Sequence, residues 1–184
     1  VLAMNRRLPE FIASQQRGEW NREAGEGDSS EDLDGRTVVI VGHGSIGRAL
    51  ALRLAPFGAS VIGVARHARS DARPVSALPQ LLPLADVVVD LLPLTAATER
   101  FVDRAFFASM RPGALFVNAG RGRTVDTGAL LEALNSQRLR AALDVMDPEP
   151  LPDGHPLWRA PNCLITPHVA GSVPRWRIRS HRFA

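Results

Sequence analysis

A glycine-rich turn between a β-branched run and a periodic apolar segment constrains the fold of this chain more than any other feature. Residues 37–41 read TVVIV, the composition of a strand covered on both faces, and residues 42–47 read GHGSIG. Apolar residues then recur at helical spacing up to Gly58, namely Ile46, Ala49, Leu50, Leu54 and Phe57. A strand, a GxGxxG turn and a helix in immediate succession predict a dinucleotide-binding unit.

Strand-like and helix-like segments alternate after this unit. Short apolar runs predict strands at 61–64, 87–91, 115–117, 141–145 and 164–166, and amphipathic stretches predict helices at 104–110 and 128–135. Strands joined by helical crossovers form parallel sheets with helices on both faces. The sequence therefore predicts an α/β fold, a Rossmann-type doubly wound parallel sheet with helices on both faces.

The first 34 residues are expected to lie outside this sheet. Residues 2–16 predict one helix with an apolar side, and the Gly- and acid-rich stretch 25–34 predicts a loop. We therefore divide the chain into a linker or dimerisation-type helix and loop (1–34), a dinucleotide-binding domain (35–171) and the start of a returning C-terminal helix (172–184). The apolar side of the first helix consists of Leu2, Leu8, Phe11 and Ile12.

Composition argues against several other classes of protein. The 184 residues suffice for one domain with a sizeable core, and no apolar run approaches the ~20 residues that cross a bilayer. The start does not read as a signal peptide, and the single cysteine, Cys163, predicts a buried inert thiol in a reducing cytoplasm. No Cys/His spacing predicts a metal site. All basic residues are scattered arginines, which argues against nucleic-acid binding, apart from one cluster: Arg175, Arg177, Arg179 and Arg182.

The glycine turn predicts where a dinucleotide binds. Gly42 permits the tight turn, Gly44 lets a pyrophosphate approach the backbone, and Gly47 lets helix and strand pack closely. The free N–H groups at the helix start, at Ser45 and Ile46, are expected to face the phosphates.

The end of the second strand predicts which dinucleotide is preferred. An acidic residue ~20 positions after the glycines usually binds the ribose 2′-hydroxyl of NAD. Residues 64–69 read VARHAR, with no acid in this place, and the guanidinium of Arg66 suits a 2′-phosphate or the face of adenine. The sequence predicts a preference for NADP(H), with NAD(H) possible. The alternative is that Arg66 is an exposed loop residue without this role.

Polar side chains follow three later strands. They lie in FVNAGRGR (116–123), LDVMDPEP (143–150) and LITPHVAG (164–171). Because ligands of doubly wound sheets bind at the carboxyl ends of the strands, Arg121, Glu149 and His168 are expected to converge on one crevice. Each residue alone also has a purely structural interpretation. Arg121 could link two loops, Glu149 could be an acid on a surface loop, and His168 could cap a strand.

Together these motifs resemble the D-isomer-specific 2-hydroxyacid dehydrogenase family from about residue 2 to residue 171. The resemblance is carried by the glycine turn, ADVVV through LPLT (85–95), NAGRG (118–122), LDV with EPL (143–151), HPLW (155–158) and TPH (166–168). It implies that Arg121 binds and polarises a 2-oxo acid and that His168 is the acid/base. It also implies that Glu149 hydrogen-bonds His168 and favours its protonated form.

The resemblance further implies cofactor contacts outside the glycine turn. Asp144 would face the nicotinamide carboxamide, and Pro93, Leu94, Thr95 and Thr98 would lie along the cofactor. The full set of expected cofactor-binding residues is Gly42, Gly44, Ser45, Ile46, Gly47, Arg66, Leu92, Pro93, Thr98, Asn118, Ala119, Gly120, Asp144, His168 and Gly171.

The function implied is hydride transfer between NADP(H) or NAD(H) and a small 2-oxo or 2-hydroxy acid, such as glyoxylate or hydroxypyruvate. A cytoplasmic enzyme that is a homodimer at full length is expected. Two alternatives stay open: a formate or phosphite dehydrogenase of the same fold, and a non-catalytic dinucleotide-sensing binding protein. Complete family members carry a separate substrate domain that is largely missing here, so this chain alone is expected to bind nucleotide but to turn over slowly or not at all.

Overall fold

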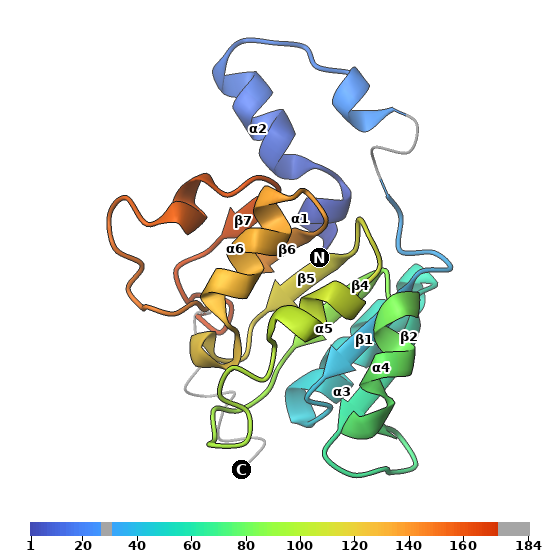
Figure 1. Cartoon of the computed structure of the whole chain (residues 1–184). Helices are drawn as coiled ribbons and strands as arrows, with labels where there is room; N and C mark the ends of the chain where they lie inside the picture. Colours follow the sequence, from blue (N-terminus) through green and yellow to red (C-terminus); the bar gives the residue numbers. More distant parts are fainter. Residues whose placement is uncertain (27–30, 173–184) are drawn as a thin grey trace.

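In the computed structural model, which describes residues 1–26 and 31–172, seven parallel strands form one sheet in the order β3-β2-β1-β4-β5-β6-β7 (Figure 1). The chain builds outward from β1 through β2 to β3 and then returns to the other side of β1 with β4. This order confirms the Rossmann-type doubly wound sheet. The strands are β1 (Thr37–Val41), β2 (Ser60–Ala65), β3 (Arg73–Pro74), β4 (Val87–Asp90), β5 (Leu115–Asn118), β6 (Arg140–Leu143) and β7 (Cys163–Ile165).

Helices cover both faces of the sheet. One apolar cluster joins the sheet to α4, α5 and α6, and a second joins its opposite face to α1 and α3. Alternate residues of β1 supply the two clusters: Val39 lies in the first and Val38 in the second, and both are fully buried. The α-helices are α1 (Leu2–Asn5), α2 (Leu8–Gln16), α3 (Ser45–Leu54), α4 (Leu78–Leu81), α5 (Arg104–Ser109) and α6 (Thr127–Asn135).

Single 3-10 turns complete the connections. They are η1 (Glu23–Gly25), η3 (Ala55–Phe57), η4 (Val75–Ala77), η5 (Leu82–Leu84), η6 (Gly122–Thr124) and η7 (Pro156–Arg159). The prediction of strand and helix positions from residue 36 onward is confirmed within two residues at the other boundaries, but α3 ends at Leu54, three residues before its predicted end, and gives way to the 3-10 turn η3. β3, α4 and its flanking turns were not predicted. In particular, β6 ends at Leu143 and not at Val145, so Asp144 lies directly after the strand.

The single helix predicted for residues 2–16 is wrong, because the chain forms two helices that meet at Arg6 and Arg7. Arg7 adopts a left-handed conformation, with φ of 51°. Pro9 explains the break: in a continuous helix its ring would clash with the carbonyl of Asn5, and it has no N–H to donate. At the start of α2 the same proline is tolerated.

The apolar pattern of α3 also differs from its burial. Gly47 and Leu54 are buried, whereas Ile46 and Phe57 are 68% and 45% exposed. The helix packs on the sheet on the side of Gly47. Ile46, one residue earlier, therefore lies on the exposed side of the helix. Gly58 ends the segment, as predicted, in a left-handed conformation with φ of 75°.

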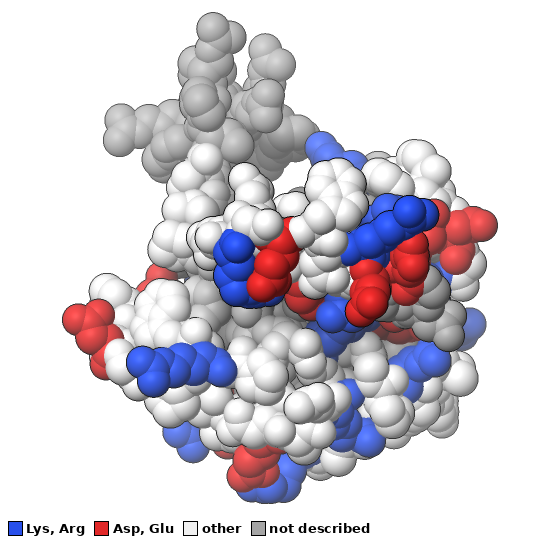
Figure 2. All heavy atoms as spheres, turned by 90° about the horizontal axis from the view of Figure 1, so that it is seen from above, with Lys and Arg blue, Asp and Glu red and all other residues white. Residues whose placement is uncertain are grey.

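Charges on the described surface are mixed. On the face shown in Figure 2, arginine and acidic side chains lie beside one another. Among the described residues, no helix is long and apolar enough to cross a membrane. The arginine cluster at 175–182, and all but the first residue of the predicted segment 172–184, lie outside the described residues.

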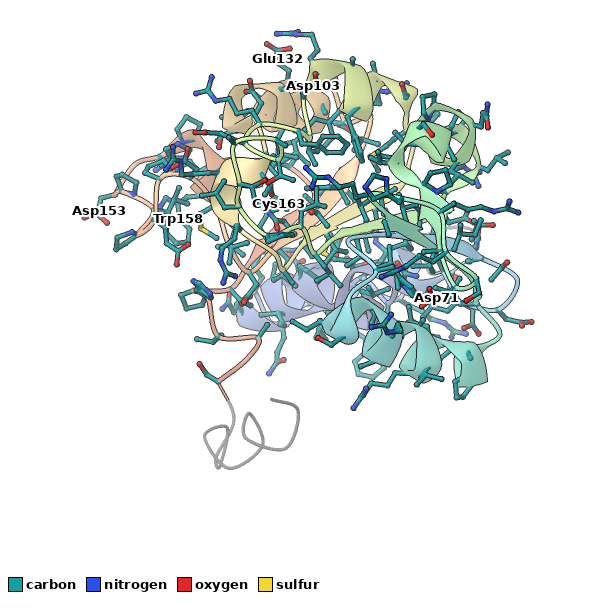
Figure 3. All side chains as sticks on the ribbon, turned by 90° about the horizontal axis from the view of Figure 1, so that it is seen from below. Asp71, Asp103, Glu132, Asp153, Trp158 and Cys163 are labelled. Atoms are coloured by element: carbon teal, nitrogen blue, oxygen red, sulfur yellow. The ribbon has the colours of Figure 1, made fainter. Side chains whose placement is uncertain are left out.

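Cys163 lies in β7, as the sequence predicted, but is half-buried and not fully buried (labelled in Figure 3). Burial raises the pKa of its thiol to about 12. The thiolate is therefore scarce near neutral pH, which agrees with an inert thiol.

Candidate active site

A cavity of about 820 Å³ lies at the carboxyl ends of β1, β2 and β4. The strand order reverses between β1 and β4, and the crevice at such a point is where doubly wound sheets bind their ligands. The walls are formed by residues 41–46, 64–66, 69, 75, 91–93, 95–98 and 101. They include eight of the expected cofactor-binding residues: Gly42, Gly44, Ser45, Ile46, Arg66, Leu92, Pro93 and Thr98.

The three glycines of the turn serve three different purposes. A Cβ on Gly42, whose φ is 101°, would lie 2.7 Å from the carbonyl carbon of Leu91. A Cβ on Gly47 would lie 2.8 Å from the carbonyl oxygen of Gly42, so this glycine lets α3 approach the sheet. A Cβ on Gly44 would meet nothing within 4 Å. Gly44 therefore borders open space in the cavity, which fits the close approach of a pyrophosphate to the backbone.

Arginines gather at the end of β2, beside α3. Asp71 lies next to this helix (Figure 3) and forms ion pairs with Arg48 at 3.2 Å and Arg69 at 3.4 Å. The hydrogen bond from Arg48 and the charges of both arginines hold the pKa of Asp71 below its usual value. Arg69 also donates to the carbonyl of His43. Arg66 lines the cavity and, among the described residues, forms neither an ion pair nor a side-chain hydrogen bond.

His43 is buried within the glycine turn, 6% exposed, with its ring over Gly63. A Cβ on Gly63 would lie 2.4 Å from the ring, so this glycine creates the space that the imidazole occupies. Burial lowers the pKa of His43, and the nearby charge of Asp71 opposes this only in part. Its Nδ1 has no hydrogen-bond partner among the described residues. The ring therefore forms a neutral part of the cavity wall.

The segment after β4 forms the opposite wall of the cavity. The backbone N–H of Leu92 donates to Asp90 at 2.9 Å. The Thr98 hydroxyl donates to the Pro93 carbonyl at 2.6 Å and accepts from the Thr95 N–H at 2.8 Å. These bonds hold residues 92–98 in a tight loop along the cavity.

The segment after β5 adjoins this wall. A Cβ on Gly120 would lie 2.9 Å from the Leu92 carbonyl oxygen, so the two backbones touch. Asn118 fixes the turn, because its side chain accepts from the Gly120 N–H at 3.0 Å and donates to the Arg121 carbonyl at 3.2 Å. The Arg121 side chain is exposed and donates to the Gly120 carbonyl at 2.7 Å.

A histidine–glutamate pair follows β6 and β7. His168 Nδ1 and Glu149 Oε1 are 2.5 Å apart, and both side chains are about half exposed. His168 has a φ of 53° and donates its backbone N–H to the Asp144 carbonyl at 2.8 Å. With Glu149 on Nδ1, the other ring nitrogen, Nε2, is left to exchange a proton with a ligand.

Asp144 holds the loop that carries His168. Its carboxylate accepts hydrogen bonds from the hydroxyl of Thr166 at 2.6 Å and from the N–H groups of Val169 and Ala170 at 3.0 and 2.9 Å. Burial alone would raise the pKa of Asp144, but these hydrogen bonds and the neighbouring His168 outweigh it and lower the pKa below its usual value. The family resemblance implied that Asp144 lies beside the cofactor, but it did not predict that Asp144 also braces this loop.

The remaining expected residues lie outside the cavity wall. Gly47 packs behind it, and Gly171 is exposed after β7. In the described part of the chain, no hydrogen bond or ion pair joins Arg121 to Glu149 or His168, although all three follow neighbouring strands at one sheet edge. Several wall residues were not among the expected cofactor contacts, and Arg69, Val75 and Phe101 are examples that lie outside the motifs used for prediction. Among residues 1–26 and 31–172, no cluster of His, Cys, Asp or Glu could hold a metal ion.

Comparison with known proteins places the chain in a family. The model of the D-isomer specific 2-hydroxyacid dehydrogenase NAD-binding domain matches residues 1–170. This chain belongs to the D-isomer specific 2-hydroxyacid dehydrogenase family. The assignment confirms the resemblance found in the motifs, and the matched part is the NAD-binding domain of the family.

Curated relatives of this chain include proteins named as glyoxylate/hydroxypyruvate reductases. Glyoxylate/hydroxypyruvate reductase B from Enterobacter sp. (strain 638) is 39% identical over 96% of this chain and 57% of its own length. The human glyoxylate reductase/hydroxypyruvate reductase is 38% identical over 96% of this chain and 56% of its own length. The chain thus spans just over half the length of these relatives.

Solved structures share the fold of this family member. The TT0316 protein from Thermus thermophilus has a TM-score of 0.87 at 43% identity, covering 97% of this chain and 57% of that one. A D-isomer specific 2-hydroxyacid dehydrogenase from Xanthobacter autotrophicus Py2, in complex with NADPH and MES, has a TM-score of 0.81 at 35% identity, covering 95% and 72%. The NAD-dependent formate dehydrogenase from Staphylococcus aureus, in complex with NAD, has a TM-score of 0.86 at 31% identity, covering 97% and 54%.

Proposed function

We propose that the protein containing this chain transfers a hydride between NADP(H) and a small 2-oxo or 2-hydroxy acid. The observation that carries the proposal is the His168–Glu149 pair at the same sheet edge as a cavity built around a dinucleotide-type glycine turn. The space beside Gly44 and the N–H groups at the start of α3 fit a pyrophosphate. The bound nicotinamide would supply or accept the hydride.

The residues of this chain then have distinct tasks. The guanidinium of Arg121 would bind the substrate carboxylate and polarise its carbonyl. His168 would donate its Nε2 proton to the carbonyl oxygen as the carbonyl carbon gains the hydride, which yields a 2-hydroxy acid, and would take the proton back in reverse. Glu149 would hold the imidazole by Nδ1 and stabilise its charged form. Asp144 would brace the loop that positions His168.

The substrate class rests on the relatives. Reductases of glyoxylate and hydroxypyruvate match this chain at 38–39% identity, whereas the formate dehydrogenase from Staphylococcus aureus shares 31%. The former class is therefore our first choice. Formate oxidation is the second candidate, because that enzyme has the same fold over 97% of this chain.

Single-turnover kinetics test this proposal. The protein is mixed in excess over NADPH with glyoxylate or hydroxypyruvate, and the loss of NADPH absorbance is followed, so that even a slow transfer becomes visible. A parallel reaction contains NADP⁺ or NAD⁺ with formate. We expect oxidation of NADPH by the 2-oxo acids. Reduction of the oxidised nucleotide by formate alone would shift the assignment to formate, and no transfer in either direction by a nucleotide-bound protein would favour a dinucleotide sensor.

The NADP(H) preference is proposed from the arginines at the end of β2. Arg66 borders the cavity without an ionic partner among the described residues, whereas Arg69 is engaged by Asp71 and His43. A free guanidinium is a strong partner for a 2′-phosphate. Arg66→Ala should weaken NADPH binding about tenfold or more and change NADH binding by less than about twofold.

Calorimetric titration of both nucleotides measures this effect. Arg53→Ala is the matched control, because this arginine of α3 is exposed, donates to the Ala49 carbonyl and lies outside the cavity wall. It should leave both affinities unchanged. Tighter binding of NADH than of NADPH by the wild-type protein would refute the preference, as would an equal loss of both in Arg66→Ala.

We also propose a cytoplasmic homodimer for the full-length protein. Leu2, Leu8 and Ile12 on α1 and α2 are each 48% exposed and offer an apolar surface for a second subunit. Phe11, also on this side, is half-buried, with its ring next to Gly25.

A further inference from the structure

Asp90 is a fully buried carboxyl group at the carboxyl end of the middle strand of the sheet. It is the last residue of β4 and pairs in register with Val41 on one side and Asn118 on the other. Its Oδ1 accepts the Leu92 N–H at 2.9 Å, and it forms no ion pair with any described residue. A buried carboxylate without a cation is strongly disfavoured, so this residue needs an explanation that the glycine turn and the His168 pair do not provide.

The hydrogen bonds around Thr124 supply that explanation. The Thr124 hydroxyl oxygen lies 2.6 Å from Asp90 Oδ2 and also 2.6 Å from the carbonyl oxygen of Arg121. A hydroxyl group has one proton to donate, and both an ionised carboxylate and a carbonyl oxygen can only accept. If Asp90 were ionised, one of these two short oxygen–oxygen contacts would contain no hydrogen. If Asp90 is protonated, each of the two contacts contains a hydrogen and is a hydrogen bond.

We propose that Asp90 is a neutral carboxylic acid that donates through the Thr124 hydroxyl to the Arg121 carbonyl and thereby positions Arg121. In this chain, Oδ2–H of Asp90 donates to Thr124, and Thr124 donates to Arg121. Oδ1 remains the acceptor for Leu92. Asp90 is a positioning residue: it acts on the backbone of Arg121. The importance of Arg121 for substrate rests on the proposed function, whereas the protonation of Asp90 does not.

Charge and burial agree with this arrangement. Burial raises the pKa of Asp90 to about 6, although hydrogen bonds from Thr124 and from the Leu92 N–H oppose the rise. In the proposed arrangement the Thr124 hydroxyl points to Arg121 instead, so its opposing effect is removed. Charged and titratable groups on neighbouring elements have other partners: Arg121 donates to Gly120, Arg123 pairs with Glu99, and the His43 ring lies against Gly63.

The arrangement links the two parts of the site. Asp90 holds Leu92 on the cavity wall through one oxygen and the Arg121 turn through the other. The Arg121 carbonyl also accepts from the Thr124 N–H and the Asn118 amide, both at 3.2 Å, so the 2.6 Å contact with the hydroxyl is the closest of the three. Loss of the proton on Asp90 would remove a hydrogen bond on the Arg121 side and let this turn relax.

The protonation state is tested by infrared spectroscopy from about pH 4 to about pH 9. We expect the C=O stretching band of a protonated carboxylic acid to persist to about pH 6 or above, well past the ordinary value of 3.8. Asp90→Asn should lack this band. Asp103→Asn should keep it, because Asp103 is an exposed helix cap that accepts the Phe106 N–H. A wild-type spectrum without such a band above about pH 5 would overturn the proposal.

The relay itself is tested by ¹³C NMR of the Arg121 carbonyl. In the wild-type protein its chemical shift should titrate with the same midpoint as the infrared band. Thr124→Ser keeps the hydroxyl and should preserve this titration, whereas Thr124→Val removes the hydroxyl and should abolish it. An Arg121 shift that does not follow Asp90 in the wild-type protein would refute the relay. The Thr124 pair also keeps the test decisive if Asp90→Asn fails to fold.

Binding of oxamate, a 2-oxo acid analogue, separates this inference from the proposed function. With NADPH saturating, Thr124→Val should weaken oxamate binding about tenfold and Thr124→Ser by less than about threefold, with NADPH affinity unchanged in both. Equal oxamate affinity in wild type and Thr124→Val would remove the positioning role. A wild-type protein that shows the titrating relay but binds no oxamate would contradict the proposed function and leave the protonated Asp90 established.

Discussion

Replacing His168 by asparagine is expected to lower the single-turnover rate of NADPH oxidation by about 10²–10⁴-fold, the range that a positioned acid/base contributes. Asparagine is the suitable replacement, because His168 has a φ of 53° and asparagine adopts this left-handed conformation readily. The loop should therefore stay in place, held by Asp144 through Val169 and Ala170. NADPH affinity should fall far less than the rate, because the variant keeps the glycine turn and loses only one of the expected cofactor contacts.

Two further variants sharpen this result. Glu149→Gln keeps an acceptor for Nδ1 but removes the charge that stabilises the imidazolium, so the rate should fall less, by about tenfold. His67→Asn, on an exposed histidine outside the cavity wall, is the control and should have no effect. A His168→Asn rate within about threefold of wild type would show that His168 is not the proton donor.

Replacing Gly122 by alanine is expected to cause the largest loss of stability of any single methyl addition at this site. The new Cβ would lie 1.8 Å from the Met146 carbonyl oxygen and 2.1 Å from its carbonyl carbon. Both are backbone atoms, so no side-chain rotation can relieve the overlap. Forced overpacking costs about 1–3 kcal/mol and at times more, and we expect a loss of about 3 kcal/mol or a failure to fold.

Urea unfolding monitored by circular dichroism measures this loss. Gly113→Ala is the matched control, because its Cβ would meet nothing within 4 Å although its φ is 81°. It should lose only the roughly 1–2 kcal/mol that a left-handed conformation costs a residue with a side chain. If Gly122→Ala were as stable as Gly113→Ala, the segments that follow β5 and β6 would not lie as close together at Gly122 and Met146 as the structure shows.

Asp90 predicts a pH effect on stability. Its pKa in the folded protein, about 6, lies above the ordinary 3.8 because of burial, so folding favours the protonated form. The stability it contributes is fully present below about pH 4 and is lost as the pH rises through about 6. Over this window the free energy of unfolding should fall by about 3 kcal/mol more in wild type than in Asp90→Asn. The readout is the unfolding free energy of both proteins across that pH range, and equal pH dependence would contradict the account.

The sequence predicted the centre of the fold because several local signals agree there. The β-branched run of β1, the glycine turn and the apolar period of α3 each occupy adjacent residues and point to one structure. The N-terminal segment failed because the apolar pattern was followed past Pro9, whose ring ends any helix begun before it. β3 consists of only two residues, Arg73 and Pro74, and is too short to show the alternating hydrophobic pattern from which a strand is predicted.

The sequence indicated candidate site residues where they follow a strand end, and it gave no sign of roles that depend on contacts distant in sequence. The hydrogen bond of His168 with Glu149, expected from the family resemblance, is present in the structure. In the sequence, Asp90 looks only like part of an apolar strand, because its hydrogen-bond partner Thr124 lies 34 residues further along the chain. Likewise, the Asp144 carboxylate is engaged by residues 166–170, a contact that no local pattern signals.

The most direct test of the central claim, a dinucleotide site at the junction of β1 and β4, is a calorimetric titration with NADPH and NADH. Wild type is compared with Gly44→Val, because a side chain at Gly44 meets no protein atom within 4 Å and its φ of −86° and ψ of −155° suit valine. The account predicts that wild type binds NADPH more tightly than NADH. It also predicts that Gly44→Val, equally stable, loses more than about tenfold in affinity for both. A folded wild-type protein that binds neither nucleotide, or a Gly44→Val variant that binds them as well as wild type, would contradict it.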